Sequence, residues 1–105
     1  MNYQVALTDR AARDLEEAYG WYAERAPEAA VRWYNGFLQA LASLANNPER
    51  CAIAPESRKT DTGIRQLLYG RRRSYRALFL IREQTVVVLH IRHTARKDAS
   101  LEDLL

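Results

Sequence analysis

The chain has 105 residues, the usual size of one folded domain, so we expect a single hydrophobic core and no second lobe. Hydrophobic residues make up 48% of it and charged residues 28%, which excludes an intrinsically disordered protein. No apolar run approaches the roughly 20 residues that cross a bilayer, and residues 1–10 do not resemble a secretory signal. With a single cysteine, Cys51, and hence no internal disulfide, the chain is expected to be cytoplasmic and not membrane-bound.

The charges are distributed unevenly along the chain. Residues 1–56 contain five basic and eight acidic residues, whereas residues 57–97 contain eleven basic and two acidic ones, a net charge of +9. Residues 98–105 are acidic again. The basic segment favours a polyanionic partner such as RNA, DNA or an acidic protein segment, although a simple solvated surface has the same composition.

The N-terminal part predicts a strand followed by two helices. Apolar and polar residues alternate over residues 2–7, as in a strand with one buried face. Apolar residues at three- and four-residue spacings then predict a helix that is capped by Thr8 or Asp9 and runs to Arg25, and a second helix over residues 26–45. We expect an antiparallel helical hairpin. Its aromatic residues are expected to pack between the helices: Trp21, Tyr22, Trp33 and Tyr34.

The C-terminal part predicts a loop and three strands. Residues 46–63 carry prolines, asparagines and a glycine without periodicity and predict a long loop. Three β-rich runs follow at Ile64–Tyr69, Ser74–Arg82 and Thr85–His93, separated by short turns, and predict an antiparallel meander. The predicted fold is therefore α+β, with the strand, two helices and three strands forming an antiparallel sheet that has the helical hairpin packed on one face.

Alternation along the last two strands divides the sheet into two predicted faces. The odd positions are expected to lie under the helices: Tyr75, Ala77, Phe79, Ile81, Val87, Leu89 and Ile91. The even positions would share the face that the helices leave open: Arg76, Leu78, Leu80, Arg82, Val86, Val88, His90 and Arg92. A mixed apolar and cationic face favours a protein partner, so an acidic or amphipathic segment is expected to cover it; the alternative is a solvated outer face.

Few residues are spaced for catalysis. His90 and His93 are three apart, which places them on opposite faces of a strand, so neither a metal site nor a cofactor is expected. Metal-free RNA cleavage is compatible with the sequence, because Arg73, Arg76 and Arg96 would stabilise a crowded phosphorane and either histidine would act as acid or base. The same arginines would equally bind phosphates without cleaving them.

Three stretches of the chain carry a family resemblance. They are Val5–Thr8 running into a helix with Asp14-Leu15, Tyr75–Phe79, and Val86–His93 followed by Ala95-Arg96. Their order and spacing, over about residues 3–98, resemble the RelE/ParE superfamily of toxins from type II toxin–antitoxin systems. The resemblance implies a toxin that arrests bacterial growth, a role in plasmid stabilization, and neutralisation by a cognate antitoxin within a toxin–antitoxin hetero-oligomer.

The superfamily has two branches with different targets. RelE-like members cleave mRNA at the ribosome, whereas ParE-like members inhibit DNA gyrase and are not nucleases. By similarity, Arg76 and Arg96 match arginines of RelE-like nucleases. However, Arg65–Tyr69 replaces the lysine-rich second strand of the RelE type, and no tyrosine follows Arg96. The Trp-Tyr pairs of the helical hairpin and the ending Leu89–His93 look more like ParE.

Three functional hypotheses follow. The first is a ParE-like inhibitor of DNA gyrase that is not an enzyme. The second is a RelE-like, metal-independent endoribonuclease that acts on mRNA at the ribosome, with Arg76, His90, His93 and Arg96 as catalytic residues. The third is a small nucleic-acid-binding module with no toxin role. For a toxin, the residues expected to bind the antitoxin or the target are Arg71, Arg72, Arg73, Arg76, Leu78, Leu80, Arg82, His90 and Arg92.

Overall fold

The computed structural model describes residues 2–60 and 62–94, which form one sheet and a pair of long helices. The elements are β1 (Gln4–Leu7), α1 (Asp9–Arg25), α2 (Pro27–Ala42), the short α3 (Ser57–Thr60), β2 (Arg65–Tyr69), β3 (Tyr75–Arg82) and β4 (Thr85–His93). The predicted α+β class and the order of strands and long helices are confirmed. Within the described residues, no helix is long and apolar enough to cross a membrane.

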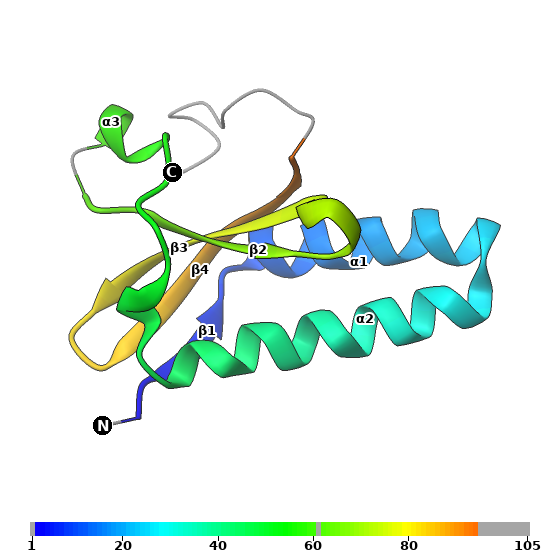
Figure 1. Cartoon of the computed structure of the whole chain (residues 1–105), viewed down its shortest axis with the longest axis horizontal. Helices are drawn as coiled ribbons and strands as arrows, with labels where there is room; N and C mark the ends of the chain where they lie inside the picture. The colour runs from blue at the N-terminus through cyan, green and yellow to red at the C-terminus, as the bar shows by residue number, and fades with distance from the viewer. Residues whose placement is uncertain (1, 61, 95–105) are drawn as a thin grey trace.

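The start of α1 is fixed by Thr8. Its hydroxyl accepts a hydrogen bond from the Ala11 amide at 3.1 Å, which confirms the predicted cap, and donates one to the Leu89 carbonyl at 3.0 Å. Ala26 ends α1, and Pro27 occupies the first turn of α2, where an amide would have no helical partner. The two helices form the expected antiparallel hairpin (Figure 1).

The strands are ordered β1-β4-β3-β2. Strands β2, β3 and β4 form the predicted antiparallel meander, but β1 pairs with β4 in parallel, from Gln4 opposite Thr85 to Leu7 opposite Val88. The sheet is therefore mixed, and the expectation of a wholly antiparallel sheet is wrong for β1. Alternation of apolar residues is the same for either strand direction, so the sequence pattern carried no signal for this pairing.

A bulge changes the phase of alternation in β4. Leu78 lies opposite His90 and Phe79 lies opposite Val88, so Leu89 is an extra residue without a partner in β3. Ahead of the bulge, Val86 and Val88 are the residues that face the helices. The prediction that these two valines lie on the open face is therefore wrong.

The main core lies between the sheet and the helical hairpin. Its buried side chains are Ala11, Leu15, Phe37, Leu41, Leu44, Cys51, Ala77, Phe79, Val86, Val88 and Ile91. The predicted positions of Ala77, Phe79 and Ile91 are confirmed. Gly36 of α2 has no side chain where the Tyr69 ring packs, because a Cβ there would collide with the tyrosine hydroxyl, which donates to the Trp33 carbonyl at 2.9 Å.

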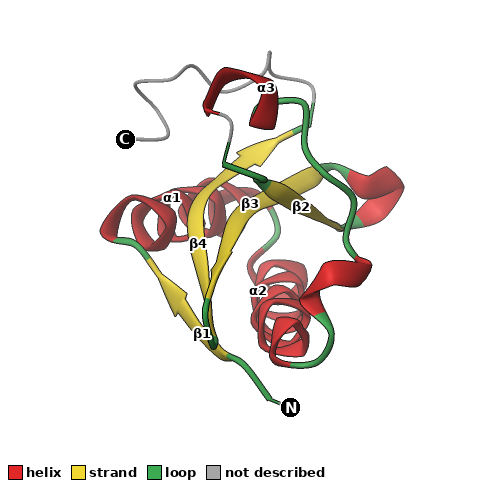
Figure 2. Cartoon of the chain, turned by 90° about the vertical axis from the view of Figure 1, so that its left-hand side faces the viewer, coloured by secondary structure: helices red, strands yellow, loops and turns green. Residues whose placement is uncertain are grey.

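The segment between the helices and β2 covers part of the other sheet face. Ala54 and Ile64 form a second buried cluster with Leu78, and the Ala54 amide donates to the Ile64 carbonyl at 2.8 Å. The Gln66 amide donates to the Ala52 carbonyl at 3.0 Å, so the segment also runs along the edge of β2. Figure 2 shows this segment passing beside β2 toward α3. The predicted open face is thus partly closed, and Leu78 is fully buried.

Candidate functional site

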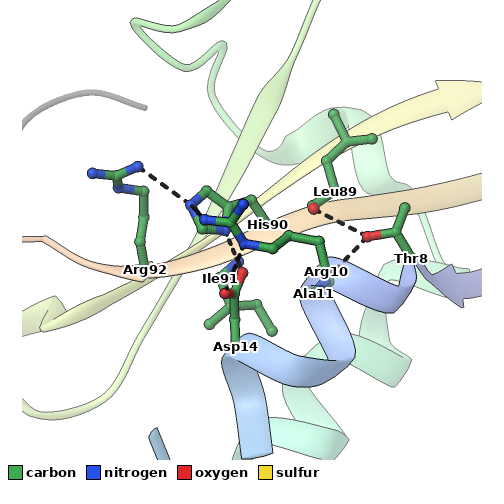
Figure 3. Close-up of polar contacts among 8 residues, drawn as sticks. All are labelled: Thr8, Arg10, Ala11, Asp14, Leu89, His90, Ile91 and Arg92. Atoms are coloured by element: carbon green, nitrogen blue, oxygen red, sulfur yellow. Dashed lines mark hydrogen bonds and ion pairs between the residues drawn. The ribbon is translucent and has the colours of Figure 1, made fainter. Parts of the chain in front are cut away.

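Helix α1 crosses the edge of β4 just beyond the end of β1. Since β1 ends at Leu7, opposite Val88, the backbone of β4 past this point has no β1 partner. Asp14 of α1 takes that place: its Oδ2 atom accepts a hydrogen bond from the Ile91 amide at 3.0 Å and also contacts Nδ1 of His90 (Figure 3). One carboxylate therefore orients the imidazole and holds the helix on the strand.

Two arginines approach the other ring nitrogen of His90. Nη2 of Arg10 lies 3.5 Å from Nε2, and Nη1 of Arg92 lies 3.3 Å from it (Figure 3). Guanidinium groups only donate, so these contacts are hydrogen bonds when Nε2 carries no proton and the ring proton is on Nδ1, facing Asp14. The Nε atom of Arg10 also donates to Oδ1 of Asp14 at 3.1 Å.

The electrostatics of Asp14 follow from these contacts. Burial raises the pKa of this carboxyl, but hydrogen bonds from His90, the Ile91 amide and Arg10, together with the charge interaction with His90, outweigh burial. The pKa of Asp14 is lowered from its ordinary value of 3.8. Asp14 is therefore ionised at neutral pH.

This cluster has the groups of an acid–base site. A carboxylate-oriented imidazole beside two cations is suited to proton transfer and to stabilising a phosphate. The side chain of His90 is only 3% exposed, however, so a substrate would reach its ring only past Arg10 and Arg92. Within residues 2–60 and 62–94, no group of three or more His, Cys, Asp or Glu side chains is placed to hold a metal ion.

Arg76 of β3 lies opposite Arg92 of β4 and shares its sheet face, but the Arg76 side chain extends beneath the segment that precedes β2. It forms a two-pronged ion pair with Glu56, at 2.9 and 2.6 Å, and donates to Oε1 of Gln66 at 3.1 Å. Glu56 is fully buried and Arg76 is 7% exposed. The prediction that Arg76 lies on an open face is wrong, because the segment around Ala54 and Glu56 folds back over the sheet with a carboxylate that neutralises it.

A groove of about 650 Å³ opens beside the His90 cluster. It lies between α1, the middle of α2, and the adjacent ends of β3 and β4. These elements contribute Trp21, Tyr22, Trp33, Tyr75, Arg92 and His93. Trp33 contacts Tyr22 and Tyr75 edge to face, with ring centroids 5.9 and 5.2 Å apart, and Tyr75 contacts His93 at 5.2 Å. Packing between the helices is confirmed for Tyr22 and Trp33, but Trp21 is 59% exposed, so that expectation is wrong for it.

The three consecutive arginines lie in the exposed turn between β2 and β3. Arg72 and Arg73 adopt left-handed backbone conformations, with φ of 57° and 55°. Arg71 lines the groove, whereas Arg73 lies against a shallower hollow beside β2. The positive charge of the three arginines is therefore divided between the groove and the hollow beside β2.

The other predicted site residues are dispersed. Arg82 is exposed at the far end of β3, and Leu80 is partly buried against the second apolar cluster. Arg96 lies outside the described residues. The structure brings His90 and Arg92 together and places His93 in the neighbouring groove. Arg76 lies opposite Arg92 on the same sheet face, as predicted, but its side chain is held by Glu56; Arg82 lies apart, at the far end of β3.

Sequence reasoning missed Asp14, Arg10 and Glu56 as partners of the predicted site residues. Asp14 occupies a polar position of α1, and its partner His90 lies 76 residues further along the chain. Glu56 lies in a stretch without periodicity. Its one signal was a carboxylate close to the basic half of the sequence, which does not specify a partner.

Two solved structures have similar folds. A chain from the chromosomal ParDE toxin–antitoxin system of P. aeruginosa is 23% identical with a TM-score of 0.72, and the match covers 87% of this chain and 95% of that one. A chain from the RelBE2 toxin–antitoxin complex of Mycobacterium tuberculosis is 26% identical with a TM-score of 0.59, over 91% of this chain and 95% of that one. No curated protein sequence matches the chain. The fold is therefore that of the RelE/ParE toxins, as the resemblance implied.

The family is defined more narrowly by sequence. The family model described as the ParE toxin of the type II toxin–antitoxin system parDE matches residues 5–98. The chain belongs to this ParE toxin family.

Proposed function

We propose that this ParE-family toxin arrests growth by inhibiting DNA gyrase, as a binding protein and not as a nuclease. The observation that carries the proposal is the state of Arg76, which the resemblance aligns with an arginine of RelE-like nucleases. Here the Arg76 guanidinium is paired with the buried carboxylate of Glu56, so it is not presented to a phosphate. The ParE family match over residues 5–98 supports the same branch.

The antitoxin is the second part of the proposal. Both solved relatives come from toxin–antitoxin systems, which supports a cognate antitoxin that neutralises this chain in the cytoplasm as part of a hetero-oligomer. The candidate contacts for the antitoxin or for gyrase are four exposed cations, Arg71, Arg72, Arg73 and Arg82, together with the half-buried Arg92. Arg82 and the arginine turn lie at opposite ends of the eight-residue β3, so a partner covering both would extend over about 25 Å.

A RelE-like endoribonuclease is the second candidate function. It is favoured by one observation, the imidazole of His90 held between Asp14 and two arginines. In that mechanism His90 Nε2 would accept the proton of the ribose 2′-hydroxyl, and Arg10 and Arg92 would stabilise the phosphorane. His93 would be the second acid–base group.

The test is to induce the chain without its antitoxin and to follow the incorporation of labelled thymidine and methionine during the first minutes. We expect DNA synthesis to stop while translation continues, and purified gyrase to lose supercoiling activity when the toxin is added. An immediate stop of translation with cleaved mRNA would overturn the gyrase proposal and support the nuclease.

Point variants separate the two functions at the level of residues. If the protein is a gyrase inhibitor, His93→Ala is expected to leave growth arrest within a few fold of the parent. If it is a nuclease that uses His93, the same change would reduce mRNA cleavage by about 10²–10⁴-fold. The Arg32→Ala variant, at an exposed position of α2, is the control for a nonspecific effect of substitution.

A further inference from the structure

The groove beside the His90 cluster has the size of a ligand site. Its volume of about 650 Å³ lies within the range of roughly 300–1,000 Å³ that small-ligand sites occupy. Five parts of the chain line it, namely α1, α2, the turn before β3, the start of β3, and β4. The core of the fold therefore fixes most of its shape, since α1, α2, β3 and β4 pack together, whereas the exposed turn contributes Arg71.

The helical side of the groove is aromatic. Trp21 is 59% exposed at this position, and the guanidinium carbon of Arg25 lies 3.9 Å from the centroid of its ring. The cation covers one face of the indole, which leaves the opposite face for a planar ligand. Behind it, Tyr22 and Trp33 meet edge to face and form an apolar floor.

The strand side of the groove is basic. Arg71, Arg92 and the imidazole of His93 line it, and the exposed Arg72 follows next to Arg71. On the helical side Asp14 is already bound by His90 and Arg10, which leaves the exposed Glu17 as the main opposing charge. The groove therefore presents an aromatic wall opposite cations.

We propose that this groove binds single-stranded nucleic acid, with one base stacked against Trp21 and its phosphate held by Arg71 and Arg92. Aromatic rings next to cations are the chemistry by which proteins bind single strands, because each nucleotide supplies both a flat ring and a negative charge. An acidic peptide supplies the charge but not a ring at every unit. The inference goes beyond gyrase inhibition, since it gives the toxin a contact with nucleic acid of its own.

The experiment is fluorescence anisotropy of labelled ten-nucleotide oligo-dT and oligo-U, titrated with the full-length chain at increasing salt. We expect binding that weakens with salt at a slope of about −0.7 per phosphate contact. Trp21→Leu keeps an apolar side chain but removes the stacking ring, and is expected to weaken binding by about tenfold. Circular dichroism confirms that each variant is folded.

Matched charge variants locate the site. Arg71→Ala is expected to weaken binding several-fold, whereas Arg82→Ala removes the same charge at the far end of β3 and is expected to leave binding unchanged. Glu17→Gln removes the opposing carboxylate and is expected to strengthen binding.

Three results would overturn the proposal. The first is no binding of either oligonucleotide, and the second is equal weakening by Arg71→Ala and Arg82→Ala, which would mean unspecific attraction to a basic surface. The third is binding of an acidic peptide of the same charge but not of the oligonucleotides, which would assign the groove to a protein partner. None of these results depends on the target of growth arrest, so the gyrase proposal is tested separately.

Discussion

Two polar clusters, one around Arg76 of β3 and one around His90 of the neighbouring β4, pair a carboxylate with a nitrogen base. They lie on the same face of the sheet and differ in their access to solvent. Glu56 and Arg76 are buried, with side chains that are 0% and 8% exposed. Asp14, which lines the groove, is 12% exposed, and its helical partner Arg10 is 42% exposed. Charges that are closed off in pairs hold parts of a fold together, whereas cations that remain at the surface are available to a partner.

The largest expected effect comes from breaking the buried ion pair of Glu56 and Arg76. Glu56→Gln leaves the Arg76 guanidinium buried without a counter-charge and is expected to lower the free energy of unfolding by about 3–5 kcal/mol. Urea unfolding followed by circular dichroism measures it. The double variant Glu56→Leu with Arg76→Met removes both charges and is expected to recover most of the loss. A loss below about 1 kcal/mol in Glu56→Gln would mean that this pair does not hold the segment on the sheet.

The same contrast explains what the sequence could predict. Elements with local periodicity were predicted closely: Thr8 caps α1, and β4 covers the residues expected of it. The burial of Arg76 was not predictable, because it depends on a segment without periodicity that pairs with β2 through Ala52 and Ala54. Local patterns carry no information about such long-range backbone contacts.

The candidate site shows the same limit. His90 and Arg92 were singled out by residue type, and alternation placed them correctly on one face with Arg76. Ahead of the bulge at Leu89 the same alternation failed for Val86 and Val88, because a bulge has no signature in an apolar run. Asp14 was hidden among the polar residues of α1, and only the closing of α1 against β4 brings it to His90. Residue chemistry therefore suggested candidates, while tertiary contacts determined which of them are neighbours.

The second prediction concerns Asp14, the carboxylate of the more exposed cluster, which consists of Asp14, His90, Arg10 and Arg92 and is called the open cluster below. Asp14→Ala leaves the Ile91 amide and Nδ1 of His90 without their acceptor and is expected to lower the free energy of unfolding by about 1–3 kcal/mol. This is less than for Glu56→Gln, because the open cluster is closer to water. Urea unfolding of both variants in one buffer gives the comparison, and a larger loss for Asp14→Ala would reverse the ranking of the two clusters.

The third prediction is a dependence on pH. Because the pKa of Asp14 is lowered in the folded state from 3.8, its ionised form contributes stability that is present above pH 3.8 and is lost as the pH falls through the folded pKa. The advantage of the parent protein over Asp14→Asn is therefore expected to shrink on acidification below about pH 4. Unfolding curves at a series of pH values test it. An advantage that is the same at pH 6 and pH 3 would contradict a lowered Asp14 pKa.

The smallest expected effect on stability is that of Arg10. This residue pairs with Asp14 one helical turn away and is 42% exposed, so water screens the pair, and Arg10→Gln is expected to change the free energy of unfolding by less than about 0.5 kcal/mol. If the open cluster binds a partner, Arg10→Gln is expected to weaken growth arrest or antitoxin affinity while the protein stays folded. Titration with the purified antitoxin measures the change in affinity. A stability loss as large as that of Asp14→Ala would instead make Arg10 a structural residue. The open cluster would then resemble the buried Glu56–Arg76 pair, and Arg71, the exposed cation of the groove, would be left as the candidate for contact with a partner.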